Sequence, residues 1–100
     1  MASSLDLQRE FQALCKNVYF QPPESVKLLY PCIVYKRSAG DTRFADNKKY
    51  SYTAGYDVVV VEMDPDRKLA TDVYMHFAYC REGSPYISNN LYHSPFTIYF

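Results

Sequence analysis

The pattern of apolar and polar positions is most regular between Tyr50 and Met63, where the chain reads YSYTAGYDVVVVEM. Alternating tyrosines followed by valines are typical of a β-strand, because aromatic and β-branched side chains suit a pleated surface. From Val58 onward the strand is apolar on both faces. We therefore expect either a central strand covered on both faces by its own chain, or a strand with its own helix on one face and another molecule on the other.

A helix is expected directly after this strand. Asp64 can accept a hydrogen bond as the N-cap residue, and Pro65 suits the first helical position because no N–H is needed there. Asp64 and Asp66 would also lie near the positive end of the helix dipole. The apolar stripe of this helix, which would dock on the sheet, is Leu69, Ala70, Val73 and Phe77.

An amphipathic helix is also predicted near the N-terminus, from about Ser4 to Asn17. A short extended segment, Val18 to Phe20, follows it and stops at Pro22 and Pro23, since proline pushes the preceding residue toward extended geometry. The apolar residues that define one face of the helix are Leu7, Phe11, Leu14, Cys15 and Val18.

Three further strands complete the predicted fold. They run from Tyr30 to Ser38, from Ala78 to Tyr86 and from Leu91 to Phe100, with a turn at Ser88 to Asn90 before the last one. The order of elements predicts a single α+β domain spanning residues 1–100, with a largely antiparallel sheet and two helices packed on one of its faces.

The stretch from Ser38 to Lys49, SAGDTRFADNKK, is small, polar and charged. It is predicted to be a connection of about twelve residues, which is long compared with the ~2 to 5 residues of a usual hairpin loop. Loops of this length are often functional. We expect it to be mobile in the free subunit and ordered by a partner.

Composition narrows the classes of partner. Eleven basic and eleven acidic residues give a formal net charge of zero, which removes the electrostatic attraction that dominates binding to nucleic acid or to anionic membrane. The longest aliphatic run, Val58 to Val61, is far shorter than the ~20 apolar residues that span a bilayer, so no membrane association is expected. Eleven tyrosines and six phenylalanines are many for so small a domain, and aromatic rings that remain at the surface favour a protein interface.

Candidate chemistry is sparse. His76, Cys80 and His93 could ligate a metal, but zinc sites normally show two paired ligand clusters, which this spacing lacks. Cys32 and Cys80 lie in apolar runs, where burial raises the pKa of a thiol and makes it unreactive. The chain has three glycines and no phosphate-cradling loop. We therefore expect no catalytic residue, no metal, no cofactor and no enzymatic activity.

The same residues are also compatible with a different class of function. An exposed sheet that carries tyrosines could stack unpaired bases, as in a small single-stranded nucleic-acid-binding module. The main argument against it is the small number of basic residues, of which Arg43, Lys48 and Lys49 form the one cluster of note.

Five segments, taken in order, resemble the small tail-completion, or tail-terminator-like, proteins of long-tailed bacteriophages. The resemblance covers nearly the whole chain and rests on the succession and spacing of the segments, since no single one is diagnostic. The segments are KNVYFQPP at 16–23, YPCIVYKR at 30–37, FADNKKY at 44–50, MDPD at 63–66 and NNLYHSPFTIYF at 89–100.

The resemblance implies a structural protein of the virion, located at the head–tail junction and assembled in the cytoplasm of the bacterial host. Such a subunit would form a homo-oligomeric ring of six copies on the last ring of tail tube protein, and it would join the tube to the head–tail connector, or stopper, protein. DNA would be a partner only as it passes through the lumen. A head-completion protein or another connector protein is the alternative within this class.

The residues expected at a subunit or partner interface lie in the first half of the long strand and in the connection before it. They are Tyr50, Tyr52, Tyr56, Arg43, Phe44, Lys48 and Lys49.

Overall fold

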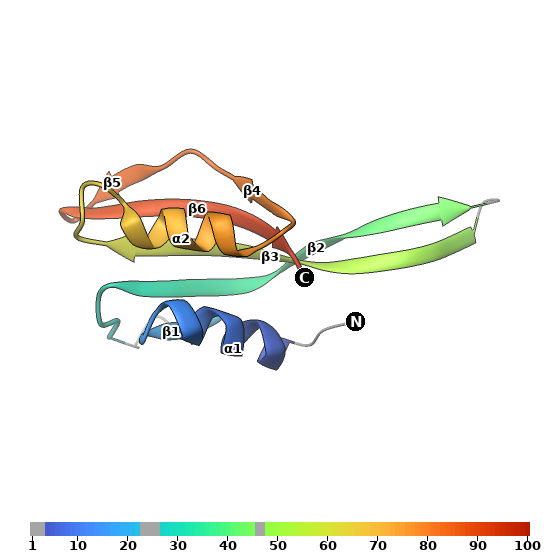
Figure 1. Cartoon of the computed structure of the whole chain (residues 1–100), viewed down its shortest axis with the longest axis horizontal. Coiled ribbons are helices and arrows are strands. Elements are labelled where there is room, and N and C mark those ends of the chain that lie inside the picture. The colour runs from blue at the N-terminus through green and yellow to red at the C-terminus, as the bar shows by residue number, and fades with distance from the viewer. Residues whose placement is uncertain (1–3, 23–26, 46–47) are drawn as a thin grey trace.

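The computed structural model describes residues 4–22, 27–45 and 48–100, and it describes only the backbone of Ser4 and of residues 39–45 and 48–53. These residues form an α+β fold, as predicted (Figure 1). The elements are α1 (Ser4–Leu14), β1 (Val18–Phe20), β2 (Cys32–Ala45), β3 (Lys48–Glu62), α2 (Lys68–His76), β4 (Cys80–Glu82), β5 (Tyr86–Ser88) and β6 (Leu91–Tyr99).

The strands form one six-stranded sheet with the order β1-β2-β3-β6-β4, and β5 pairs with β6 beside this path. All neighbouring strands are antiparallel except β1 and β2, which are parallel. The long strand β3 therefore lies at the centre, as its apolar sequence predicts. The predicted strand from Ala78 to Tyr86 is divided into β4 and β5 by Gly83, whose N–H donates to the carbonyl of Pro95 at 2.8 Å.

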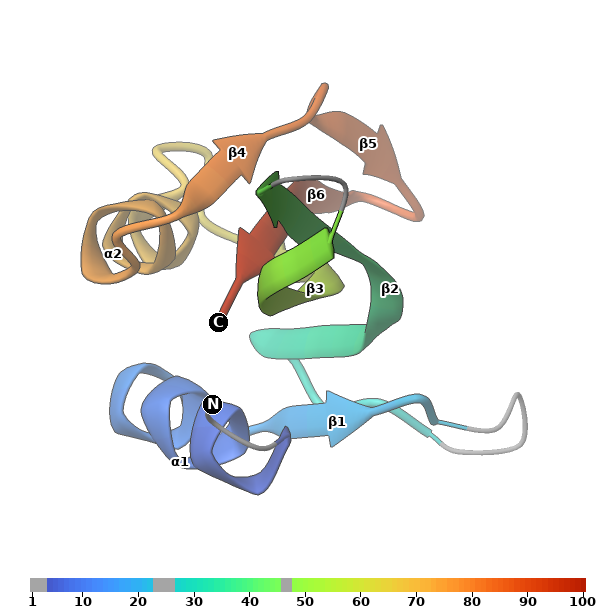
Figure 2. The same cartoon turned by 90° about the vertical axis from the view of Figure 1, so that its right-hand side faces the viewer.

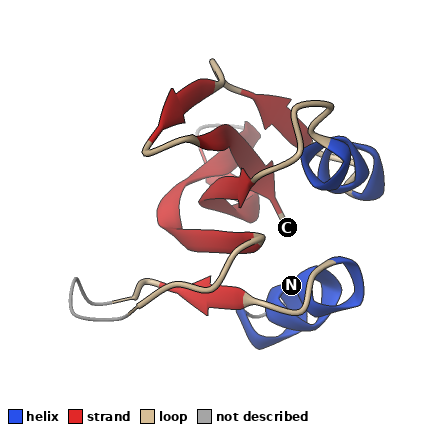
Figure 3. Cartoon of the chain, turned by 90° about the vertical axis from the view of Figure 1, so that its left-hand side faces the viewer, coloured by secondary structure: helices blue, strands red, loops and turns tan. Residues whose placement is uncertain are grey.

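Both helices lie on the same face of the sheet, which curves around them (Figures 2 and 3). The ring centroids of Phe11 in α1 and of Phe77, directly after α2, are 5.2 Å apart, and the ring of Phe11 lies 5.1 Å from that of Tyr35 in β2. This face of the sheet and the apolar stripes predicted for the two helices form one core. Its members are Leu7, Phe11, Cys15, Ile33, Tyr35, Ala54, Tyr56, Val58, Val60, Ala70, Val73, Phe77, Phe96 and Ile98.

The turn after β3 differs from the prediction. Asp64 caps a turn and not the helix: its carboxylate accepts a hydrogen bond from the N–H of Asp66 at 3.0 Å, and its carbonyl accepts one from the N–H of Arg67 at 3.0 Å. Pro65 lies within this turn, where its fixed φ suits the second position. Arg67 is left-handed, with φ 54° and ψ 47°, and α2 begins at Lys68.

The prediction of a long connection from Ser38 to Lys49 is wrong. β2 and β3 continue through this stretch as a hairpin and pair with each other as far as Ala45 and Lys48. A polar sequence does not prevent such pairing, because the ladder is made by backbone groups and only a buried face demands apolar side chains. Figure 1 shows the hairpin extending well beyond the rest of the sheet.

Candidate interface surfaces

The sheet face opposite the helices, here called the outer face, carries an apolar strip. Val34 in β2, Val59 in β3 and Pro95 in β6 are register neighbours across three adjacent strands. All three side chains remain half-buried, although they lie in the middle of the sheet. Both helices lie on the other face, so no helix of the described chain covers this strip (Figure 2).

Two adjoining hollows follow this strip. One, of about 420 Å³, lies over β2 and β3, and the other, of about 250 Å³, lies over β3, β4 and β6. They share Asp57 and Val59, and together they run across most of the outer face. Charged residues of both signs also line them: Lys36, Asp57, Arg81 and Glu82. The outer face is thus apolar at its centre and mixed in charge around it, as is common at protein interfaces.

The second feature is the projecting end of the β2–β3 hairpin, here called the arm, residues 39–45 and 48–53. The pairing between β3 and β6 ends at Gly55 and Tyr99, and the N–H of Phe100 donates to the carbonyl of Ala54 at 2.9 Å. Within the described chain, the arm strands beyond this point pair only with each other. A strand pair with two free edges can accept another strand on either side.

A β-bulge lies where the arm leaves the body. Ser38 is opposite Gly55 and Asp41 is opposite Thr53, so two residues of β2 face one of β3. A second irregularity lies between Arg43 and Phe44. Bulges increase the right-handed twist of a strand pair. The bulge therefore sets the direction in which the arm projects.

Six of the seven predicted interface residues belong to the backbone of the arm. Arg43 and Phe44 lie in β2, and the four others lie in β3: Lys48, Lys49, Tyr50 and Tyr52. The arm thus brings these residues together in one hairpin. The structure does not describe their side chains.

Tyr56, the seventh, is a core residue, and its placement at an interface is wrong. Its side chain is 2% exposed, and its ring lies 6.1 Å from that of Tyr35. The guanidinium of Arg37 covers the same ring at 5.6 Å from the centroid. Tyr56 pairs with Ile98 on β6, and so it lies where the sheet is already covered by the helices.

Val34, Val59 and Pro95 are not among the seven predicted interface residues, although another molecule on one face of the apolar strand was one of the two predicted arrangements. The signal that could have found them is the continuous apolar run of β3, which required a cover on both faces. Pairing with Val59 then identifies Val34 and Pro95 as its neighbours. This register could not be read from the single sequence, because a one-residue slip would move every side chain to the opposite face.

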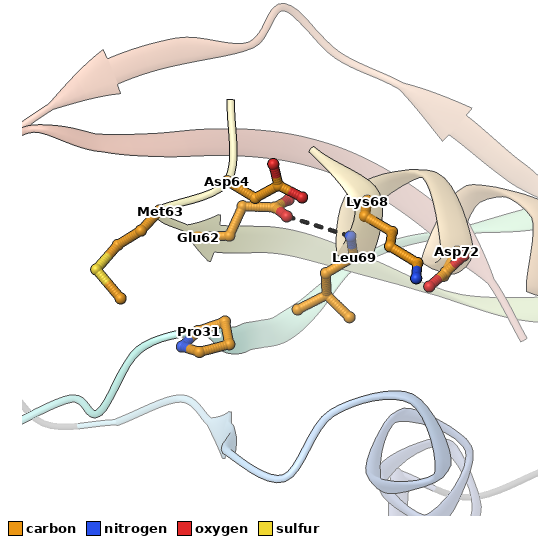
Figure 4. A pocket seen from close by; sticks show the side chains of 7 residues that line it. All are labelled: Pro31, Glu62, Met63, Asp64, Lys68, Leu69 and Asp72. Carbon is orange, nitrogen blue, oxygen red and sulfur yellow. Dashed lines mark hydrogen bonds between the residues drawn. The ribbon is translucent and has the colours of Figure 1, made fainter. Parts of the chain in front are cut away.

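Glu62 caps the N-terminus of α2 from the end of β3. Its Oε1 accepts a hydrogen bond from the N–H of Leu69 at 3.2 Å (Figure 4), and its Oε2 accepts one from the N–H of Ala70 at 3.1 Å. The side chain is only 3% exposed, and this burial raises its pKa above the ordinary glutamate value, although the two amides act in the opposite direction. Glu62, and not the predicted Asp64, therefore caps this helix. It lies seven positions before Leu69 and eight before Ala70 in the sequence.

Two of the cysteine thiols have a raised pKa. Burial raises the pKa of Cys32 to about 11, with a further contribution from the nearby Cys15, and it raises the pKa of Cys80 to about 11. For these two residues the direction of the pKa shift is the predicted one. In the described residues, His, Cys, Asp and Glu side chains form no group of three that could hold a metal ion.

None of the helices in the described part of the chain has the length and apolar character needed to cross a membrane. Comparison of the chain with protein-family models gave no match, and comparison with curated proteins found no significant similarity.

Proposed function

We propose that this protein is a structural subunit that assembles with copies of itself, and that the outer face and the arm are the surfaces completed in the assembly. The observation that carries the proposal is the apolar strip of Val34, Val59 and Pro95, which is central in the sheet and uncovered by either helix. Binding of a partner that removes such apolar surface from water stabilises the complex.

The specific role that we propose is tail completion in a long-tailed bacteriophage. This role rests on the resemblance of the five segments named above, and the two surfaces are compatible with it. The subunit would form a six-fold ring on the end of the tail tube and would meet the head–tail connector on its other side. DNA would pass through the lumen of this ring.

The outer face also bears on the alternative of a base-stacking module. A stacking platform needs aromatic rings at the centre of an open sheet face. Here the three central outer positions are aliphatic, and the tyrosines Tyr35 and Tyr56 are buried under the helices. We therefore favour a protein partner for this face.

The first test is the oligomeric state. Analytical ultracentrifugation of the purified protein over a hundredfold range of concentration, alone and with tail tube protein, should show a concentration-dependent assembly, and electron microscopy should show rings. A protein that stays monomeric at the highest concentration, with and without the tube protein, would contradict the proposal.

Substitution of Val59 tests the outer face. Val59→Lys places a charge in the middle of the apolar strip, and Val59→Thr keeps the β-branched shape while removing apolar surface. We expect at least tenfold weaker association for lysine and a smaller loss for threonine, with the far-UV circular dichroism of the monomer unchanged. Gln12→Lys on the exposed side of α1 is the matched control and should assemble as the wild type does. Normal assembly of Val59→Lys would remove the outer face from the proposal.

A further inference from the structure

A cleft of about 350 Å³ lies between the start of β2, the end of β3 and the start of α2 (Figure 4). These parts of the chain lie at the end of the molecule opposite the arm (Figure 1). Pro31, just before β2, forms one side of it. The end of β3, from Glu62 to Asp64, and the first turns of α2 form the other side. The molecule measures 50 × 26 × 23 Å, and the arm and the cleft lie at the two ends of its longest dimension.

The cleft is apolar inside and acidic at its rim. Pro31, Met63 and Leu69 supply the apolar surface, and Met63 is 62% exposed in the single chain. Three carboxylates and one ammonium group line the cleft, which gives a formal charge of −2: Glu62, Asp64, Asp72 and Lys68. Both oxygens of Glu62 are bound to the amides of α2, and one oxygen of Asp64 accepts the N–H of Asp66. A partner would therefore meet Asp72 and the other oxygen of Asp64.

The sequence of the arm region has a net charge opposite to that of the cleft. Between residues 39 and 53 there are three basic residues and two acidic ones, a formal charge of +1: Arg43, Lys48 and Lys49 against Asp41 and Asp46. The same segment contains Phe44, Tyr50 and Tyr52, which would suit an apolar cleft with an acidic rim. Arm and cleft are therefore complementary both in charge and in apolar content.

We propose that the arm of one copy binds in the cleft of the next copy, so that the copies are joined head to tail. This inference rests on the proposed self-assembly and adds which surfaces meet. A contact between two different patches at opposite ends of a subunit is heterologous, and repetition of such a contact closes into a ring when the rotation between neighbours allows it. A face that met its own copy would instead give a closed dimer.

Charge reversal tests the contact. The arm variant is Lys48→Glu with Lys49→Glu, and the cleft variant is Met63→Lys with Asp72→Lys. Lys16→Glu with Lys27→Glu makes the same change in charge as the arm variant at exposed positions outside both surfaces, and it serves as the matched control. Each variant is measured by sedimentation velocity at the wild-type assembly concentration, with circular dichroism to verify folding.

We expect the arm variant and the cleft variant each to associate at least tenfold more weakly than wild type, and the control to assemble normally. A mixture of the two variants should assemble again, because each acidic arm then meets a basic cleft and each wild-type arm meets a wild-type cleft. A single chain that carries all four arm and cleft substitutions should also recover. Raising the salt concentration should weaken the wild-type contact, since salt screens exposed charge pairs.

Several results would overturn the inference. They are normal assembly of the arm variant, equal loss in the control, no recovery in the mixture, or an arm variant that forms rings but fails only to bind tail tube protein. Each of these leaves the proposed self-assembly standing, because the wild type still assembles. A wild type that does not assemble would instead contradict the proposed function itself.

Discussion

At the scale of single residues, Glu62 links the end of the central strand to the start of α2. A carboxylate that binds two free amides at a helix N-terminus replaces a local cap and also meets the positive end of the helix dipole. Its burial opposes ionisation, so that the capping contact and the desolvation of the charge act against each other. The stability of the fold should therefore depend on the protonation of this one side chain.

We expect the free energy of unfolding to fall as pH rises through the interval between the pKa of Glu62 in the unfolded chain, about 4.3, and its higher value in the folded protein. In this interval the folded protein holds the proton more tightly than the unfolded chain does. Glu62→Gln removes the titrating group, and so it should remove this part of the slope in urea unfolding measured between pH 4 and 7. The control Asp66→Asn, at an exposed position outside the arm and the cleft, should keep it.

Glu62→Ala tests the cap itself. This substitution leaves the amides of Leu69 and Ala70 without their acceptor, and loss of a helix N-cap costs about 1–2 kcal/mol of stability. The expected result is a lower urea midpoint with an unchanged m-value. A midpoint equal to that of wild type at pH 7 would mean that the penalty of the buried charge cancels the contribution of the cap.

At the scale of elements, the arm is a part of the sheet whose described strands pair only with each other. β6 pairs with β3 only from Gly55 onward, and Phe100, directly after β6, donates its N–H to the carbonyl of Ala54. Replacement of residues 39–53 by an Asn-Gly turn should therefore leave a cooperative fold with a melting temperature within a few degrees of wild type, because the core residues are all retained. Self-assembly should be lost. Loss of the cooperative transition would show that the arm stabilises the body.

The two helices were predicted well, because the spacing of their apolar residues alone determines which face is buried. Leu7 and Phe11 define the buried face of α1, and Val73 defines that of α2, and both helices dock as expected. The arm could not be predicted in this way, because its pairing is made by backbone groups and its sequence shows no apolar alternation. The cap of α2 was also predicted incorrectly. Asp64 can act as a local N-cap, but its carboxylate binds the N–H of Asp66 in the turn, and the carboxylate of Glu62 reaches the helix instead.

At the scale of the whole molecule, the two faces of the central strand differ in burial around Val59. Val58 and Val60 are fully buried under the helices, whereas Val59 between them is half-buried and belongs to the apolar strip of the outer face. The apolar run of β3 thus contributes to folding on one side and, in our proposal, to assembly on the other. Stability and assembly should then be coupled through the same strand.

This coupling gives a prediction for the intact protein. If assembly covers the outer face, then the folded assembly is favoured by mass action, and the melting temperature should rise with protein concentration. Differential scanning calorimetry over a hundredfold concentration range should show this rise for the wild type and a constant melting temperature for Val59→Lys. The arm deletion should likewise lose the concentration dependence, because without the arm the neighbouring copy is not held against the sheet. A wild-type melting temperature that does not change with concentration, in a protein that forms rings at the same concentrations, would show that assembly adds no stability to the subunit and that the outer face stays open in the ring.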